Sequence, residues 1–321
     1  MTLQSKKRKM NKLLIIIAIL FVVFLNIAFT SATFKDFFSK ITGKATSQTT
    51  NVSITVTGAN PVTIPFVSSI SAASPTENSY VSISFYATVS DADGVNDIND
   101  SSVRANFSRS SETTRQNTSC SLVADIDSTR ANFSCTIAMW YYDGSGTWDV
   151  AVGGSDLGNK SVVYNTSTNF TYNQLQAIVI SPLSLTWATV SPGNTNQTSN
   201  NDPTIINNTG NYNIPNMTVN GINLHGDVDS SVFIGVRNVT VGNNTGSSAE
   251  CDISGPNNAT RLSNATDIQI DNTILNKGNH TINNNQTGQE LLYYCFTTIP
   301  STTSSQTYST TNGGAWTIKI T

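Results

Sequence analysis

Apolar and polar residues alternate along several stretches of the chain. In residues 81–90 the odd positions are apolar and the even positions mostly polar, and the same pattern recurs in residues 103–108 and 131–139. Because successive side chains of a β-strand point to opposite faces, this period of two indicates strands with one face on a core. Residues 140–152 predict a strand, a glycine-rich hairpin turn and a second strand.

Regular short strands separated by turns predict an all-β chain with two immunoglobulin-like β-sandwich domains, residues 51–176 and 177–321. Two polar stretches of the second domain, residues 192–216 and 242–265, are rich in Asn and Gly and predict loops. The strands expected in the second domain are residues 178–180, 183–190, 217–224, 232–241, 268–270, 291–296 and 316–320.

A single apolar segment, residues 13–29, precedes these domains. As a helix it is about 25 Å long, a little short of the roughly 30 Å hydrocarbon core of a bilayer. An apolar stripe of helical spacing then continues to Ile41, through Phe34, Phe37 and Phe38. We therefore expect residues 13–41 to be a transmembrane helix with an amphipathic extension, with the lipid bilayer as its partner.

Five basic residues just before this segment fix its expected orientation. By the positive-inside rule, residues 1–12 are a cytoplasmic basic tail, residues 42–50 a linker, and the β-domains are extracellular on a single-pass membrane protein. Two alternatives remain open. One is a cleaved signal peptide with a secreted product, although the apolar run exceeds the usual 7 to 15 residues. The other is a type IV pilin-like filament subunit, although no Gly or Ala precedes the helix at the expected cleavage point.

Composition separates the amino-terminal part from the rest. Only 12% of the chain is charged and 8% is aromatic, which fits extracellular β-domains better than a cytosolic helical enzyme. Residues 1–44 carry a net charge of +7, which leaves −10 for the remainder. A mildly acidic exterior argues against nucleic acid as a partner. With two His and no catalytic motif, we expect no enzyme activity and no organic cofactor.

The four cysteines fall into two local groups, Cys120 with Cys135 and Cys251 with Cys295. An even number in an exported chain predicts disulfides, and four cysteines allow three connectivities. The local pairing is favoured because each pair lies within one expected domain. A metal or redox site would require CxxC-like spacing, which is absent.

Asparagine in N-x-[ST] sequons is frequent, and every sequon follows the apolar segment, as expected of an exported glycoprotein. Six sequon asparagines occupy polar positions of predicted strands: Asn51, Asn106, Asn132, Asn169, Asn216 and Asn238. We expect partner surfaces where sequons are sparse, chiefly in residues 61–98 and 135–158. The 17 glycosylation candidates are Asn51, Asn99, Asn106, Asn117, Asn132, Asn159, Asn165, Asn169, Asn196, Asn207, Asn216, Asn238, Asn243, Asn258, Asn264, Asn279 and Asn285.

One segment, VSDADGVNDIND, carries the residue types of a cation site. Its candidate ligands are Asp91, Asp93, Asn96, Asp97 and Asp100. Ca²⁺ takes six to eight hard oxygen ligands, and clustered carboxylates beside a glycine turn supply them. The bidentate Glu that closes a full EF-hand loop is missing, so a solvated acidic turn is the alternative.

This acidic segment, together with ITGKATSQTTNVSITVTG and ANFSCTIAMWYYDGSGTWDVAV, resembles archaeal membrane-anchored surface proteins built from immunoglobulin-like or cadherin-like modules. The resemblance implies surface exposure and a stalk or envelope role, and it supplies no active site. We therefore expect a cell-surface glycoprotein with a structural or adhesive role. Binding of envelope proteins or glycans is the alternative role. The aromatic residues Trp140, Tyr141, Tyr142 and Trp148 fit a sugar-stacking surface, but core packing is the favoured interpretation.

Overall fold

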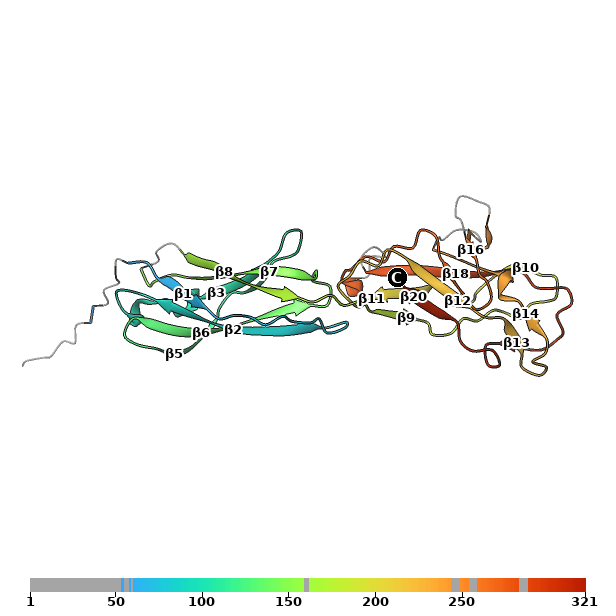
Figure 1. Ribbon diagram of the computed structural model, residues 1–321, viewed down its shortest axis with the longest axis horizontal. Helices are drawn as coiled ribbons and strands as arrows, with labels where there is room; N and C mark the ends of the chain where they lie inside the picture. Colours follow the sequence, from blue (N-terminus) through green and yellow to red (C-terminus); the bar gives the residue numbers. More distant parts are fainter. Residues whose placement is uncertain are drawn as a thin grey trace, which may run out of the picture. The chain divides into compact units, whose positions relative to one another are not determined.

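The computed structural model describes residues 53, 54, 58, 60–158, 162–243, 249–253, 259–282 and 288–321. Nearly all of them belong to one compact unit, residues 57–321. This part of the chain consists of β-strands, short 3₁₀ helices and loops, without an α-helix, which confirms the all-β prediction (Figure 1). Within these ranges no helix has the length and apolar character that would let it cross a membrane. The basic tail, the expected transmembrane helix and the linker lie outside the described residues.

Two four-stranded antiparallel sheets enclose the core formed by residues 62–172. One sheet has the order β1-β2-β6-β5 and the other β4-β3-β7-β8. Apolar side chains from both sheets pack into a single cluster, with Phe85, Phe107, Phe133 and Trp148 fully or almost fully buried. The strands are β1 Thr63–Val67, β2 Tyr80–Ser90, β3 Arg104–Ser108, β4 Arg115–Asn117, β5 Ser121–Asp125, β6 Arg130–Trp140, β7 Gly146–Gly154 and β8 Val163–Tyr172.

β2 and β6 form the longest ladder around this core. They pair without a register shift from Tyr80 opposite Trp140 to Ser90 opposite Arg130. Their alternating burial places the apolar positions on the core and the Ser, Thr and Asn positions on the outer face. The strands predicted at residues 81–90 and 131–139 are therefore confirmed, with one more residue at one or both ends.

The hairpin predicted across residues 140–152 is wrong. β6 is already paired on both edges, with β2 and β5, so β7 joins β3 and β8 in the other sheet. The glycine-rich loop of residues 141–145 therefore carries the chain between sheets. The indole Nε1 of Trp148 donates to the carbonyl oxygen of Gly144 at 2.9 Å, which ties this loop to the core.

β5 is an edge strand whose five residues are all exposed. Leu122 lies opposite Phe133 and Ala124 opposite Asn132, so Val123 is the extra residue of a β-bulge. Because neither face of this strand is buried, its sequence shows no apolar alternation.

Residues 178–320 form antiparallel sheets around a second core. The largest sheet has the order β16-β15-β18-β11-β9, with β10 also paired to β18, and the smaller ones are β17-β12-β20 and β14-β13-β19. Ile206, Met217, Leu262 and Tyr294 are buried in the shared cluster. The strands are β9 Ile178–Ser181, β10 Thr195–Thr198, β11 Thr204–Asn208, β12 Met217–Gly221, β13 Leu224–Gly226, β14 Phe233–Ile234, β15 Val239–Gly242, β16 Thr260–Arg261, β17 Thr266–Gln269, β18 Gln289–Thr298, β19 Tyr308–Ser309 and β20 Thr317–Ile320.

The strand predicted at residues 183–190 is absent, although its alternation has a physical basis. Leu185 and Trp187 pack against the core at alternate positions. The backbone is held by side chains instead of a strand partner: Asn201 Oδ1 accepts a hydrogen bond from the N–H of Thr186 at 2.9 Å, and Asn201 Nδ2 donates to the carbonyl oxygen of Ser184 at 2.6 Å.

The polar stretches predicted as loops contain the short strands β10, β11 and β16. β11 alternates in burial, but one of its inward side chains is Asn208, which is fully buried. Its Nδ2 donates to the carbonyl oxygen of Tyr212 at 2.8 Å, and its Oδ1 accepts from the N–H of Gly210. Because this hydrogen-bonded asparagine occupies a core position, β11 does not show the alternation of apolar and polar residues from which strands are predicted.

Two predicted strands are broken. Residues 217–224 divide into β12 and β13, and residues 232–241 divide into β14, a 3₁₀ helix Val236–Asn238 and β15. Asn223 occupies the break, where its Oδ1 accepts from the N–H of Val236 at 3.0 Å. The strands expected at residues 178–180, 268–270, 291–296 and 316–320 are confirmed as β9, β17, β18 and β20, with ends that differ by up to two residues.

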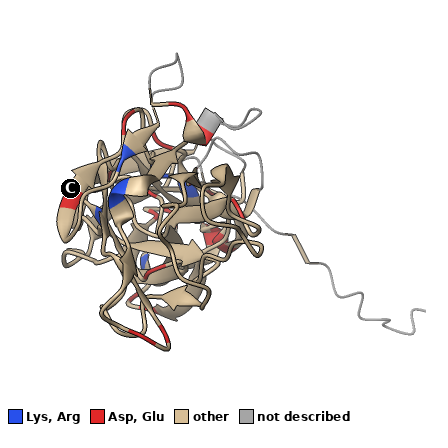
Figure 2. Ribbon diagram, turned by 90° about the vertical axis from the view of Figure 1, so that its right-hand side faces the viewer, with Lys and Arg blue, Asp and Glu red and all other residues tan. Residues whose placement is uncertain are grey.

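Charged residues are sparse in this unit, and most of the ribbon in Figure 2 is neither acidic nor basic. The most buried ion pair among the described residues joins Arg115 and Asp143, whose side chains are 18% and 2% exposed. The Arg130–Asp127 and Lys319–Asp267 pairs lie at the surface and contribute little to stability.

Candidate functional site

Three carboxylates of the predicted acidic segment meet in the loop that follows β2. Asp91, Asp93 and Asp97 each place one oxygen within 4.8 Å of the others. Asp91 directly follows the last residue of β2, and Asp97 ends the 3₁₀ helix Val95–Asp97. Three of the five ligands predicted from the acidic segment are therefore close together.

Gly94 makes the turn that brings these residues into one loop. Its φ of +124° and ψ of 155° lie in a region that is almost closed to residues with a Cβ. The N–H of Val95 donates to the carbonyl oxygen of Ser128 at 2.8 Å, and the N–H of Asp91 donates to that of Thr129 at 2.9 Å. The acidic loop is thus fixed to the turn between β5 and β6.

The chain segment that precedes β1 contacts the same carboxylates. The N–H of Gly58 donates to Asp97 Oδ2 at 2.7 Å. The N–H and the Nδ2 of Asn60 donate to the two oxygens of Asp93 at 2.7 and 3.0 Å. These bonds join residues more than 30 positions apart and hold Gly58 and Asn60 beside the acidic loop.

Asp91 is fully buried. Its Oδ1 accepts from the N–H of Asp93 at 2.8 Å, whereas its Oδ2 is buried without a hydrogen-bond partner. Burial raises the pKa of Asp91, and the nearby carboxyl groups of Asp97, Asp93 and Asp156 raise it further against the effect of that hydrogen bond. Asp156 is also fully buried and forms an isolated bridge with Ile98. Sequence reasoning missed it because it lies 65 residues beyond Asp91.

Of the two other predicted ligands, Asp100 is not part of this carboxylate cluster. Asn96 is exposed within the 3₁₀ helix Val95–Asp97. Asp100 is exposed in the next 3₁₀ helix, Asp100–Ser102, where partial burial and the nearby Asp125 raise its carboxyl pKa. The side chain of Asn99 accepts a hydrogen bond from Ser101 Oγ at 2.7 Å.

Both disulfides follow the local pairing favoured by the sequence. Cys120 immediately precedes β5 and is bonded to Cys135 on the adjacent strand β6, inside the first core. Cys251 belongs to the 3₁₀ helix Ala249–Cys251 and is bonded to Cys295 on β18. Each bond closes its ring within one core region, so neither pairing crosses between the two.

The sequon asparagines are consistently at the surface of the described residues. Four of them, Asn51, Asn159, Asn258 and Asn285, lie outside the described ranges, and each of the others is half-buried or exposed. The buried asparagines in the described part are Asn208 and Asn211, neither of which begins a sequon. Asn238 lies in a 3₁₀ helix rather than in the predicted strand.

The aromatic group at residues 140–148 divides between core and surface. Trp148 and Tyr141 are buried, as expected of core aromatics, whereas Trp140 and Tyr142 are half-buried. Tyr80, which is 50% exposed, lies opposite Trp140 at the end of the β2–β6 ladder. The ring centroids are 5.2 Å apart for Tyr80 and Trp140 and 5.9 Å apart for Trp140 and Tyr142.

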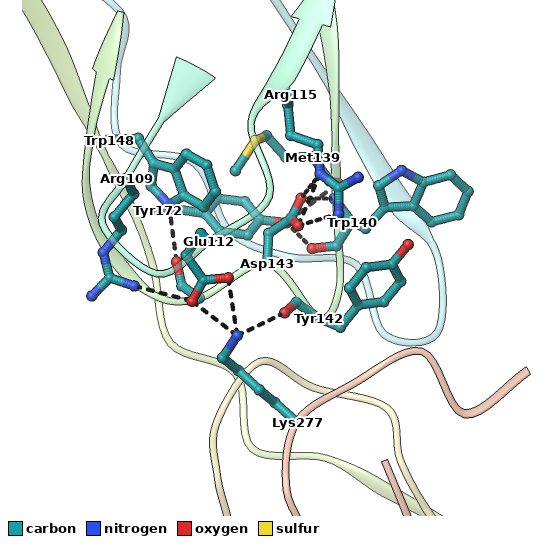
Figure 3. A network of polar contacts seen from close by, with 11 residues as sticks. Arg109, Glu112, Arg115, Met139, Trp140, Tyr142, Asp143, Trp148, Tyr172 and Lys277 are labelled. Carbon is teal, nitrogen blue, oxygen red and sulfur yellow. Dashed lines mark hydrogen bonds and ion pairs between the residues drawn. The ribbon is translucent and has the colours of Figure 1, made fainter. Parts of the chain in front are cut away.

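A polar network lies beside these rings (Figure 3). Arg115 pairs with Asp143 and lies over the ring of Tyr142, 5.4 Å from its centroid. Lys277 donates to a carboxylate oxygen of Glu112 at 3.0 Å and to the carbonyl oxygen of Tyr142 at 3.4 Å. These bonds connect side chains of the first core region to a loop of the second.

No protein-family model matches this chain, and no curated protein matches it. The resemblance to archaeal surface proteins therefore rests on the sequence segments named above.

Proposed function

We propose that this chain is a cell-surface (envelope) glycoprotein with a structural or adhesive role, and that residues 13–41 anchor it in the cell membrane. Its two β-domains are extracellular, and it is not an enzyme. The archaeal resemblance is part of this proposal.

The observation that carries the proposal is the distribution of asparagine. Among the described residues every sequon asparagine has some exposure, while both buried asparagines lie outside sequon positions. A chain that carries sugars at these sites needs their side chains at the surface. Two disulfides support the same environment, because disulfides persist in oxidising compartments.

The strand order supports an immunoglobulin-like first domain. Read in chain order, β1-β2-β6-β5 corresponds to strands A, B, E and D of that fold. The facing sheet, β4-β3-β7-β8, corresponds to C′, C, F and G. Such sandwiches commonly serve as spacer or adhesion modules on cell surfaces.

Mass spectrometry of the native protein tests the proposal. The amino-terminal peptide separates an uncleaved anchor from a secreted product and from a processed filament subunit. We expect glycans first at Asn169, Asn196 and Asn264, which are exposed. The Asn207 sequon is expected to be modified least, because its Thr209 is fully buried and donates to Glu77. Unmodified asparagine at every sequon would refute the glycoprotein.

A second candidate, glycan binding, is favoured by one observation. Tyr80, Trp140 and Tyr142 lie close together, and the chain stretches that hold them, residues 61–98 and 135–158, contain no sequon. Aromatic rings with an exposed face stack on sugar rings. We expect Tyr80→Ala to weaken binding of uncharged hexose oligosaccharides roughly tenfold. Tyr86→Ala is the matched control, because Tyr86 lies on the same face of β2 and is 51% exposed. Equal binding by both variants would refute this candidate.

A further inference from the structure

We propose that Asp91, Asp93 and Asp97 bind one Ca²⁺ ion, and that this ion fastens Gly58 and Asn60 to the first β-domain. The inference depends on neither the anchor nor the sugars, so it stands or falls separately from the proposed function.

The first support is the arrangement of oxygen atoms. Three carboxylate oxygens within 4.8 Å of one another form a cluster of hard ligands, which Ca²⁺ prefers. No ion pair of the described residues reaches Asp91, Asp93 or Asp97. The cluster therefore concentrates negative charge without a basic side chain to balance it.

The second support is independent of the clustering. A carboxylate oxygen that is removed from water normally receives a hydrogen bond, because the lost hydration is otherwise costly. Asp91 has no exposed surface, yet its Oδ2 has no partner. A bound cation supplies the missing interaction, and the neighbouring carboxylates then become ligands instead of repelling one another.

The ligand set indicates modest affinity. Three carboxylates supply half or fewer of the six to eight oxygens, and Asp93 is exposed. Water and backbone oxygens complete the coordination in weak sites of this kind. We expect a dissociation constant of about 10⁻⁴ to 10⁻³ M, as in extracellular calcium modules. Such a site fills where Ca²⁺ is millimolar and is empty at cytosolic concentrations.

The site also has a mechanical consequence. Asp93 and Asp97 hold Asn60 and Gly58 through backbone N–H bonds. A cation that fixes both carboxylates fixes these acceptors as well. Calcium then strengthens the attachment of the chain where it enters the first sheet, ahead of β1.

Thermal unfolding of the 321-residue chain tests the proposal. We expect about 10 mM CaCl₂ to raise the melting temperature by about 3 to 10 °C relative to EDTA, with a smaller effect of MgCl₂. Asp91→Asn and Asp93→Asn are expected to remove most of this shift. Asp149→Asn is the matched control, because it is the same change at an exposed position of β7 outside the cluster.

The calcium-free state gives a second measurement. In EDTA, Asp91→Asn should melt no lower than the wild type, because it relieves repulsion among the carboxylates. Hydrogen exchange should slow at the N–H groups of Gly58 and Asn60 when calcium is added to the wild type, and it should not slow in the Asp93→Asn variant. An unchanged wild-type melting temperature, an equal shift with magnesium, or a full shift in both cluster variants would overturn the proposal.

Discussion

Arg115 donates through Nε to both carboxylate oxygens of Asp143, at 2.9 and 3.0 Å. Asp143 is 1% exposed and also accepts from the N–H of Trp140 at 2.7 Å. Burial raises the pKa of the Asp143 carboxyl, and these hydrogen bonds act against that effect. The pair fastens the short edge strand β4 to the loop that crosses between the sheets.

Arg115→Met should therefore destabilise the protein by about 3 to 5 kcal/mol, because it leaves Asp143 charged, buried and without its ionic partner. Chemical denaturation measures the loss. Arg130→Met is the matched control, since Arg130 pairs with Asp127 at the surface and a much smaller loss is expected. Equal losses of unfolding free energy in the two variants would contradict the prediction that the buried Arg115–Asp143 pair stabilises the protein more than a surface pair does.

The disulfides should differ in their contributions. Cys120 and Cys135 are 15 positions apart, whereas Cys251 and Cys295 are 44 apart. By loop-closure entropy, the shorter ring contributes about 3 kcal/mol and the longer about 4. Replacing each pair with alanine and measuring unfolding in urea tests this order. The comparison should be repeated in a reducing agent, where the variants and the wild type are expected to converge.

The carboxyl group of Asp202, in the second core region, is expected to make the stability of the protein depend on pH. Burial raises its pKa to about 6, and the nearby Glu250 adds to the effect. Its Oδ2 accepts from the N–H of Tyr294, while its Oδ1 is buried without a hydrogen-bond partner. The folded state thus holds the Asp202 proton more tightly than the unfolded chain. The favourable contribution of Asp202 to the free energy of unfolding is complete below the ordinary pKa of Asp, and it is lost as the pH rises through about 6.

Asp202→Asn should accordingly stabilise the protein at pH 8 by up to about 3 kcal/mol and leave it almost unchanged at pH 4. Unfolding curves across this pH range provide the measurement. Asp229→Asn serves as the control, because the side chain of Ser231 lowers the pKa of Asp229 and no gain at pH 8 is expected. A pH-independent difference between wild type and Asp202→Asn would contradict the assignment.

Gly94→Ala should lower the free energy of unfolding by about 1 to 3 kcal/mol, because a residue with a Cβ is strained at the φ and ψ angles of this position. Gly235→Ala provides the comparison: Gly235 has an ordinary φ of −67°, and the nearest atom to an added Cβ lies 3.6 Å away. A change within about 0.5 kcal/mol is expected there. Thermal unfolding in EDTA measures both variants without any contribution from calcium.

The sequence predicted three strands of the first core region through the alternation of apolar and polar residues. β2, β3 and β6 alternate because Phe85, Phe107 and Phe133 point inward and their neighbours point outward. β5 was not predicted because none of its side chains is buried. β11 was not predicted because the polar residue Asn208, whose side chain is hydrogen-bonded, occupies one of its core positions. Apolar and polar residues alternate in residues 183–190 because alternate side chains pack on the core. The backbone there is hydrogen-bonded by the side chain of Asn201 and does not pair with another strand.

The residues at the candidate site include some that are close together in the sequence and others that only the fold brings near. Asp91, Asp93 and Asp97 are close in sequence, so spacing within one loop was sufficient to group them. Asp156 and Asn60 reach the cluster through strand pairing across the sandwich and through a backbone hydrogen bond, which local spacing does not encode.

The bulge at Val123 bears on how copies of this protein pack beside one another. An unpaired strand edge exposes backbone N–H and carbonyl groups in the even spacing that an incoming strand requires. The extra residue in β5 interrupts that spacing on an edge where Leu122 and Val123 are otherwise exposed and apolar. A neighbouring molecule that approached this edge would therefore contact it through side chains and would not extend the sheet with a regularly paired strand.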